Sequence, residues 1–204
     1  MAHKKAIKVG NKVLVGNKNI LRVNTPQYLA SYKRNLIVKT SQKVENGDFK
    51  KTTGWSLYGA TAKFDTNAGI ITLTPTTVGT SNKYFELYKN IGASIVGHKY
   101  FVSYYYKTDK ELASDARTTY GGVRVATITG ELNKWNKVAG IITSTRAVAL
   151  LDTYFTFANE VGTVNVQRVS CIDLTETFGE GNEPTTVEEA EAILGKGYIP
   201  YQYL

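Results

Sequence analysis

Apolar and polar residues alternate along most of the chain between residues 35 and 174. Valine, isoleucine, threonine and tyrosine dominate these segments, and short turns rich in glycine and asparagine separate them. A period of two residues is typical of half-buried β-strands, and turns every ~8–12 residues are typical of β-sandwiches and barrels. The pattern predicts strands near 36–39, 44–49, 55–64, 69–74, 83–89, 99–107, 122–128, 135–143, 147–157 and 163–172.

The segment 99–107 predicts a strand with two aromatic faces. One face carries Tyr100, Val102, Tyr104 and Tyr106, and the other carries Phe101, Ser103, Tyr105 and Lys107. Serine and lysine suit partial solvation, so the second face is the better candidate for a ligand surface. The alternative is that this face packs under loops or against a neighbouring subunit.

The first 24 residues predict one or two small β-hairpins. Val-Gly-Asn-Lys occurs at 9–12 and again at 15–18, and Gly-Asn between β-branched runs is a tight-turn signal. A two-stranded ribbon is only marginally stable alone in water. We therefore expect it to pack against the main domain or another chain, and we expect a homo-oligomer.

The C-terminal segment predicts a turn followed by a short amphipathic helix. An extended apolar stretch is expected to stop at Gly179, where a positive φ costs little. After Pro184, Thr185 or Thr186 caps a helix, with Glu188 or Glu189 as the capping-box partner. The apolar face of this helix comprises Val187, Ala190, Ile193 and Leu194.

The 204 residues divide into a basic N-terminal arm (1–34), a β-sandwich (35–174) and an acidic turn-helix tail (175–204). Charged residues make up 21% and apolar residues 42% of the chain, which is typical of a globular protein. The single cysteine, Cys171, excludes an internal disulfide and is expected to be buried. No apolar run approaches the ~20 residues of a membrane span, so we expect no membrane segment and no signal peptide.

The net charge of +8 is distributed unevenly. Residues 1–44 carry ten basic side chains and no acidic one, whereas residues 173–204 carry seven acidic side chains and one lysine. The arm is rich in lysine but poor in arginine and aromatic residues, which favours an acidic protein surface over nucleic acid. The docking residues predicted on this basis are Lys4, Lys5, Lys8, Lys12, Lys18 and Arg22.

The run from Ile172 to Thr185 supports a family-level hypothesis. Asp-Leu-Thr, Phe-Gly and Gly-Asn-Glu-Pro-Thr follow one another before the acidic helix. This order resembles a segment of tailed-bacteriophage structural proteins, where it commonly closes a carbohydrate-binding-module-like sandwich. The resemblance implies a virion component.

Other landmarks resemble carbohydrate-binding-module jelly rolls. They are Asn35-Leu36-Ile37, Glu45-Asn46-Gly47-Asp48-Phe49, Gly54-Trp55, Gly97 to Tyr104, Lys134 to Val138 and Gly162 to Asp173. The resemblance implies an all-β fold, a two-sheet antiparallel jelly-roll sandwich. It places Trp55 and Trp135 at core positions, and a sugar-stacking platform is the alternative.

The same resemblance implies a structural calcium near Glu45 and Asp48. Many relatives carry a further aspartate in the closing strand, where this chain has Asn165 and Gln167. Calcium prefers six to eight oxygen ligands. Asp48 has the alternative of bonding its own backbone in the Asn-Gly turn.

No motif for catalysis is present. His3 lies near the start, and His98 lies in a predicted turn where we expect solvent exposure. The sequence contains no Gly-x-Ser-x-Gly elbow, P-loop or His-Glu-x-x-His. We therefore expect a protein that is not an enzyme and that needs no other cofactor.

Together these observations predict a non-catalytic phage virion surface protein, made in the host cytoplasm. It would be a capsid decoration or head-fibre subunit, or a tail-fibre or baseplate accessory, that binds other virion proteins through the arm. The sandwich would face outward and adhere to host glycans through Phe101, Tyr105, Trp55 and Trp135. The alternative is a soluble carbohydrate-binding module of a larger glycan-active system.

Overall fold

A computed structural model describes residues 6–9, 12–15, 41–76 and 84–195. The chain divides into two units, Met1–Val38 and Lys39–Leu204. In the first unit, β1 (Ala6–Val9) pairs antiparallel with β2 (Lys12–Val15), with Val9 opposite Lys12. This pair matches the first predicted hairpin, whereas the strand predicted at 36–39 lies outside the described residues.

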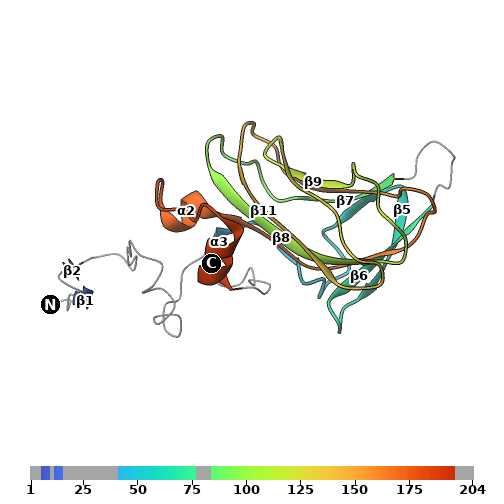
Figure 1. The fold of residues 1–204 in the computed structure, drawn as a ribbon, viewed down its shortest axis with the longest axis horizontal. Helices are drawn as coiled ribbons and strands as arrows, with labels where there is room; N and C mark the ends of the chain where they lie inside the picture. The colour runs from blue at the N-terminus through green and yellow to red at the C-terminus, as the bar shows by residue number, and fades with distance from the viewer. Residues whose placement is uncertain (1–5, 10–11, 16–40, 77–83, 196–204) are drawn as a thin grey trace. The chain divides into compact units, whose positions relative to one another are not determined.

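The second unit consists of two antiparallel sheets (Figure 1). The five-stranded sheet has the order β10 (Val123–Thr127), β9 (Arg117–Tyr120), β12 (Leu150–Thr156), β7 (Tyr84–Asn90) and β4 (Ser56–Tyr58). The six-stranded sheet has the order β11 (Asn136–Thr143), β8 (Lys99–Thr108), β13 (Val164–Asp173), β6 (Ile70–Pro75) and β5 (Ala60–Asp65), and β3 (Ser41–Gln42) also pairs with β13. The predicted all-β jelly-roll sandwich is confirmed.

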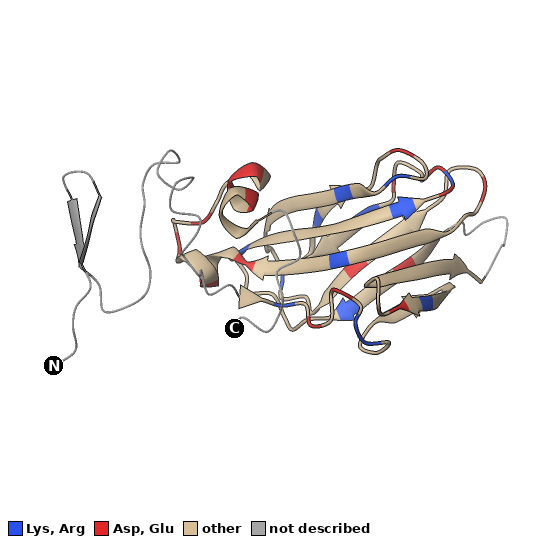
Figure 2. Cartoon of the chain, turned by 90° about the horizontal axis from the view of Figure 1, so that it is seen from below, with Lys and Arg blue, Asp and Glu red and all other residues tan. Residues whose placement is uncertain are grey.

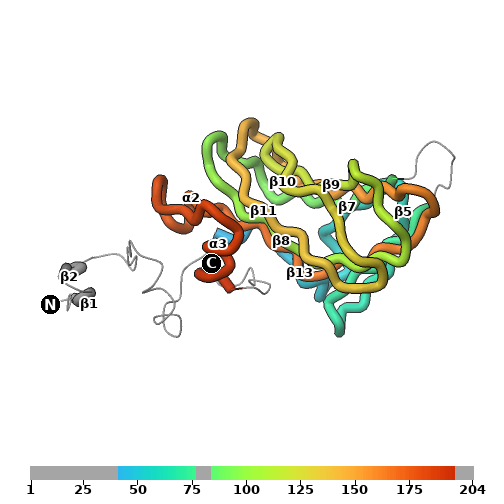
Figure 3. Tube along the Cα trace, viewed as in Figure 1, coloured from blue at the N-terminus to red at the C-terminus, as the bar shows by residue number. Residues whose placement is uncertain are grey.

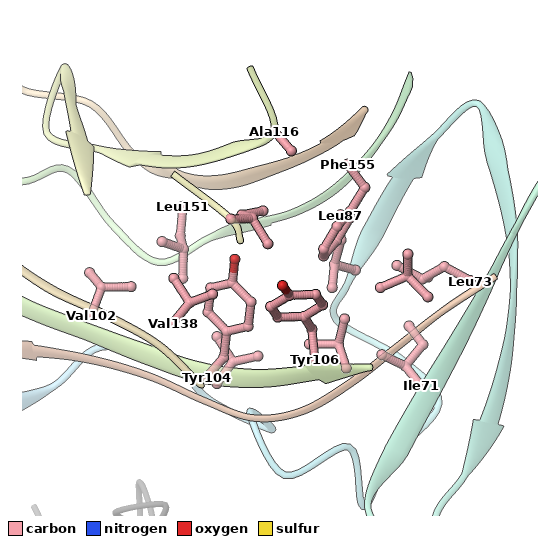
Figure 4. Packing of buried hydrophobic residues seen from close by; sticks show 14 of the residues in the cluster. Ile71, Leu73, Leu87, Val102, Tyr104, Tyr106, Ala116, Val138, Leu151 and Phe155 are labelled. Atoms are coloured by element: carbon pink, nitrogen blue, oxygen red, sulfur yellow. The ribbon is translucent and has the colours of Figure 1, made fainter. Parts of the chain in front are cut away.

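The main core lies between the two sheets and is built from tyrosine, phenylalanine and aliphatic side chains. Tyr104 and Tyr106 rise from β8 toward Leu151, Leu87 and Phe155 of the opposite sheet (Figure 4). The hydroxyl groups of Tyr104 and Thr118 lie 2.7 Å apart. The predicted inward face of β8 is therefore confirmed, because alternation along a strand sends every second side chain to the same side.

The core position predicted for Trp135 is wrong, whereas Trp55 does pack against the core, at its edge. Trp135 is 38% exposed, and Trp55 is half-buried at the edge of the core, with its ring centroid 5.2 Å from that of Phe49. Trp135 directly precedes β11, where the even-numbered residues Val138 and Ile142 face the core. Side chains alternate along a strand, so the odd-numbered Trp135 lies on the outer face.

Several segments differ from the predicted strands: β3 was not predicted, and the strand predicted at 55–64 is divided into β4 and β5. Residues 44–49 form a turn, with Asn46 at φ 56° and Phe49 at φ 51°. The Phe49 amide donates to the Asn46 carbonyl, and this tight geometry interrupts strand pairing. In addition, β9 was not predicted, because its four residues follow a loop rich in polar and charged side chains.

The chain after β13 becomes helical at Leu174, five residues before Gly179, where the extended stretch was expected to stop. The predicted extended stretch to Gly179 is wrong, since β13 ends at Asp173 and α2 occupies Leu174–Phe178. Asp173 caps α2 by accepting a hydrogen bond from the Glu176 amide at 2.9 Å. Gly179 ends the helix with φ 84°, the positive value predicted from the sequence.

The predicted C-terminal helix is present as α3 (Val187–Leu194). Thr186 caps it, and Glu189 accepts hydrogen bonds from Thr185. Ala190 packs against Phe101, Ile172 and Leu174, so this acidic segment is bound to the six-stranded sheet.

The segment from Asp173 to Glu183, which we call the clasp, joins β8, α2 and the following turn. The Thr175 hydroxyl accepts from the Lys99 amide at 2.9 Å and donates to Glu183 at 2.8 Å. His98, expected in solvent, instead lies with its Nδ1 3.0 Å from the buried Asp173 carboxylate. The motif residues therefore anchor the tail to the sandwich.

Candidate functional site

The outer surface of the five-stranded sheet carries a group of tyrosines and carboxylates. On β7, Phe85 and Leu87 point into the core, so Tyr84, Glu86 and Tyr88 share the outer face. On β12, Leu151 and Phe155 point inward, so Asp152 and Tyr154 face outward with them. We call the following residues the tyrosine face: Tyr58, Tyr84, Glu86, Tyr88, Arg117, Asp152 and Tyr154.

Strand register brings these side chains into one surface. Asp152 is opposite Tyr88, and Tyr154 is opposite Glu86 on β7 and Arg117 on β9. On the other side of β7, Tyr58 of β4 is also opposite Glu86. Directly opposite Cβ atoms are ~4.5–5.5 Å apart, so the side chains of these four strands are neighbours.

The aromatic rings are arranged in two sets. Tyr58 is 54% exposed and stacks on Tyr84, with ring centroids 5.9 Å apart and an interplanar angle of 25°. The Tyr58 phenol also raises the pKa of Tyr84. At the other end, the Arg117 guanidinium carbon lies 4.4 Å from the centroid of Tyr154.

The two carboxylates lie on the same face between these rings. Burial raises the pKa of Asp152, and burial together with the Asp152 charge raises the pKa of Glu86. Within the described part of the chain, Asp152 Oδ1 is buried and has no hydrogen-bond partner. An unsatisfied buried acceptor costs about 1–3 kcal/mol, so this atom lowers the stability of the native state.

The glycan residues predicted from the sequence lie elsewhere. Phe101 is 2% exposed beneath α3, so its predicted contact with a ligand is corrected to a packing contact. Trp55 donates its indole N–H to the Asn46 carbonyl at 3.0 Å and packs at the core edge. Tyr105 and Trp135 share the outer face of the six-stranded sheet, Tyr105 half-buried and Trp135 exposed.

The predicted calcium ligands do not converge on a common point with other acids. Glu45 is exposed and pairs with Lys51 at 3.5 Å, while Asp48 is half-buried in the turn near Gly69. Among the described residues, no group of three or more histidine, cysteine, aspartate or glutamate side chains is arranged to hold a metal. The calcium site stays a prediction.

Of the predicted docking residues, Lys8 lies in β1 and Lys12 in β2. Lys4, Lys5, Lys18 and Arg22 lie outside the described residues. No helix in the described ranges has the length and apolar character needed to cross a membrane.

A signal for the tyrosine face is present in the sequence, although the predicted site did not include it. The predicted strand 83–89 alternates Tyr84, Glu86 and Tyr88 with core residues, as the strand at 99–107 does with its own aromatics. Two features of the fold decide which aromatic side chains are accessible to a ligand. They are the register between β7 and β12 and the packing of α3 over Phe101. Neither is visible in a single sequence.

No known protein family matches the sequence, and no curated protein matches it. Among solved structures, a CBM4 protein is 16% identical with a TM-score of 0.45, covering 63% of this chain and 98% of its own length. The N-terminal cellulose-binding domain of Cellulomonas fimi β-1,4-glucanase C is 16% identical with a TM-score of 0.47, covering 61% and 91%.

A third solved structure is the enzymatically active domain of tailspike protein 4 from bacteriophage CBA120. It is 18% identical with a TM-score of 0.43, and the match covers 64% of this chain but only 21% of that protein.

Proposed function

We propose that this chain is a non-catalytic glycan-binding protein and that the tyrosine face holds the sugar. Four tyrosine rings lie beside two carboxylates on one sheet face, and this juxtaposition carries the proposal. Tyrosine rings stack on the apolar face of a pyranose, and carboxylates accept hydrogen bonds from sugar hydroxyl groups.

The same geometry supports binding without hydrolysis. Glycoside hydrolysis uses two carboxyl groups that flank the scissile bond. Glu86 and Asp152 project from the same side of one sheet, on neighbouring strands, and would approach a sugar chain from the same side. In this proposal they accept hydrogen bonds from the sugar hydroxyl groups.

A glycan array followed by titration of the best ligand tests this proposal. We expect Tyr84→Ala and Tyr154→Ala each to weaken binding roughly tenfold or more, since each removes a stacking ring. Leu132→Ala, at an exposed residue outside the face, is the matched control and should bind normally. Unchanged affinity in both tyrosine variants, or steady release of reducing ends from the ligand, would refute the proposal.

We further propose that the protein acts on a phage particle, with the basic hairpin docked on a capsid or tail protein and the sandwich facing outward. The β1–β2 pair and the excess of lysine in residues 1–44 support this role.

Deleting residues 1–25 should abolish incorporation into particles, and Lys8→Glu with Lys12→Glu should weaken docking in a salt-sensitive way. Unchanged incorporation would favour the alternative, a soluble carbohydrate-binding module.

A further inference from the structure

The outer surface of the six-stranded sheet carries a second, oppositely charged group of side chains. A row crosses four strands, because Lys107 on β8 is opposite Asn165 on β13, Asn165 is opposite Thr72 on β6, and Thr72 is opposite Lys63 on β5. The row spans three inter-strand spacings, ~14 Å. We call this row, together with Tyr105, Trp135 and Arg168, the basic face.

A β-bulge adds the arginine to this face. The register of β13 against β8 shifts between Gln167 and Ser170, and Arg168 within the shift has φ 58°. A residue with a Cβ is uncommon at positive φ, and bulges often re-aim a side chain next to a functional site. Here the bulge lets Arg168 share the outer surface, with its guanidinium carbon 6.0 Å from the centroid of Tyr105.

Two cations of the basic face, Lys107 and Arg168, lie beside aromatic rings on and next to β8 (Figure 3 shows β8 between β11 and β13). Lys107 Nζ is 5.6 Å from the centroid of Trp135. Lys137, which lies 5.7 Å from the Tyr105 ring, already pairs with Glu191. In contrast, Lys63, Lys107 and Arg168 take part in no ion pair within the described residues.

We propose that the basic face binds a polysaccharide that carries carboxylate groups, such as a polyuronate. The arginine fork matches a carboxylate, and the lysines add positive charge along the row. Exposed Trp135 offers a ring for a sugar, while Asn165 and Thr72, bonded to each other at 2.7 Å, offer polar groups for hydroxyls.

This ligand differs from that of the tyrosine face. Glu86 and Asp152 on the tyrosine face would repel a carboxylate, whereas the basic face attracts one. The two faces are the outer surfaces of opposite sheets, so one sandwich would present a different sugar chemistry on each side. Binding at the basic face therefore does not depend on the proposed function of the tyrosine face.

Binding of the full-length chain to polygalacturonate tests the inference. Dextran is the control for a neutral polysaccharide, and poly-glutamate and single-stranded DNA are the controls for polyanions without uronic acid. We expect polygalacturonate to bind more tightly than the other three polymers, and we expect its affinity to fall as the NaCl concentration is raised. The variant Lys107→Ala/Arg168→Gly should lose roughly tenfold or more in affinity. Glycine suits the positive φ of residue 168, so the fold should persist.

Two controls separate the outcomes. Tyr84→Ala should bind polygalacturonate normally. Arg168→Lys should bind polygalacturonate more weakly than the wild type but more tightly than the double variant, because lysine keeps the charge and lacks the two-pronged guanidinium group. Absence of polygalacturonate binding, equal binding of poly-glutamate or DNA, or a double variant that melts normally and binds like the wild type would each overturn the inference. Loss of polygalacturonate binding in Tyr84→Ala would also overturn it.

Discussion

Asp152 has a carboxylate oxygen that is desolvated without a compensating donor. Burial raises the pKa of this carboxyl, so the native state holds the proton more tightly than the unfolded chain does. Stability should therefore fall as pH rises from the ordinary carboxyl pKa of about 4 through the raised value, and it stays lower above that window.

The substitution Asp152→Asn removes the charge that causes this loss. We expect the variant to melt a few degrees above the wild type near neutral pH, to show a flatter stability profile toward acid, and to bind glycan less well. Thermal denaturation across pH checks the first two effects. The matched control is Asp65→Asn, at an exposed carboxylate whose Oδ1 accepts hydrogen bonds from two backbone amides. The asparagine Oδ1 can still accept these bonds and no buried charge is removed, so this variant should not melt above the wild type. A less stable Asp152→Asn at neutral pH would contradict the expectation.

Tyr104 is the buried tyrosine whose hydroxyl is tied into the opposite sheet. It lies 2.7 Å from the Thr118 hydroxyl, and burial raises its pKa. Tyr104→Phe should lower the free energy of unfolding by about 1 kcal/mol, because Thr118 loses a partner. Urea denaturation measures this change.

Tyr106→Phe is the control for Tyr104. The structure gives no hydrogen bond to the Tyr106 hydroxyl from any described residue, and burial alone raises the pKa of Tyr106 to about 12. This variant should change stability by less than Tyr104→Phe does. The reverse order would show that the Tyr104–Thr118 contact contributes little.

At the scale of elements, the clasp around α2 fixes the C-terminal segment to the sandwich (Figure 2 shows the acidic positions on the helices). Burial opposes ionisation of Glu183, but hydrogen bonds from backbone amides and Thr175, together with Lys99, hold its pKa below the usual range. Its stabilising contribution is therefore lost as pH falls through that lowered value.

Thr175→Val breaks two hydrogen bonds of this clasp without changing the side-chain shape greatly. We expect the free energy of unfolding to fall by about 1–3 kcal/mol, because the Lys99 amide and Glu183 both lose a partner. Thr185→Val, at an exposed hydroxyl that donates to Glu189, should cost less. Equal effects in chemical denaturation would show that the clasp is no stronger than a surface contact.

Alternation predicted most strands and the inward face of β8, because burial between two sheets imposes a period of two. It failed after Asp173, where the extended-looking Ile-Asp-Leu-Thr run contains an N-cap with Glu176 three residues later. The same parity rule, applied from Val138 back to Trp135, would have placed that ring outside. The helix-capping residues therefore predict where β13 ends, and the alternation along β11 predicts which side of the sheet Trp135 faces. The size and apolar character of tryptophan alone predict neither.

At the scale of the molecule, the two sheets present outer faces of different charge. Acids join the tyrosines on the five-stranded sheet, and lysines and an arginine join the aromatics on the six-stranded sheet. The sequence predicted an aromatic sugar site but placed it among Trp55, Trp135, Phe101 and Tyr105. Only pairing between distant strands, and the helix over Phe101, show where open aromatic surface remains.

The division of the chain predicts that the sandwich unit folds without the first 38 residues. A variant lacking them should unfold cooperatively, with a free energy of unfolding within about 1 kcal/mol of the full chain. It should also keep its glycan affinity. Loss of cooperative unfolding would show that the two units depend on each other.

Mapping amide chemical shifts during titration with an array-selected oligosaccharide tests the central claim most directly. Shifts should gather on β4, β7 and β12, around Tyr58, Tyr84, Glu86, Asp152 and Tyr154. They should disappear in Tyr84→Ala. Saturable shifts that lie wholly outside these strands, or that persist unchanged in the variant, would contradict a sugar site on the tyrosine face.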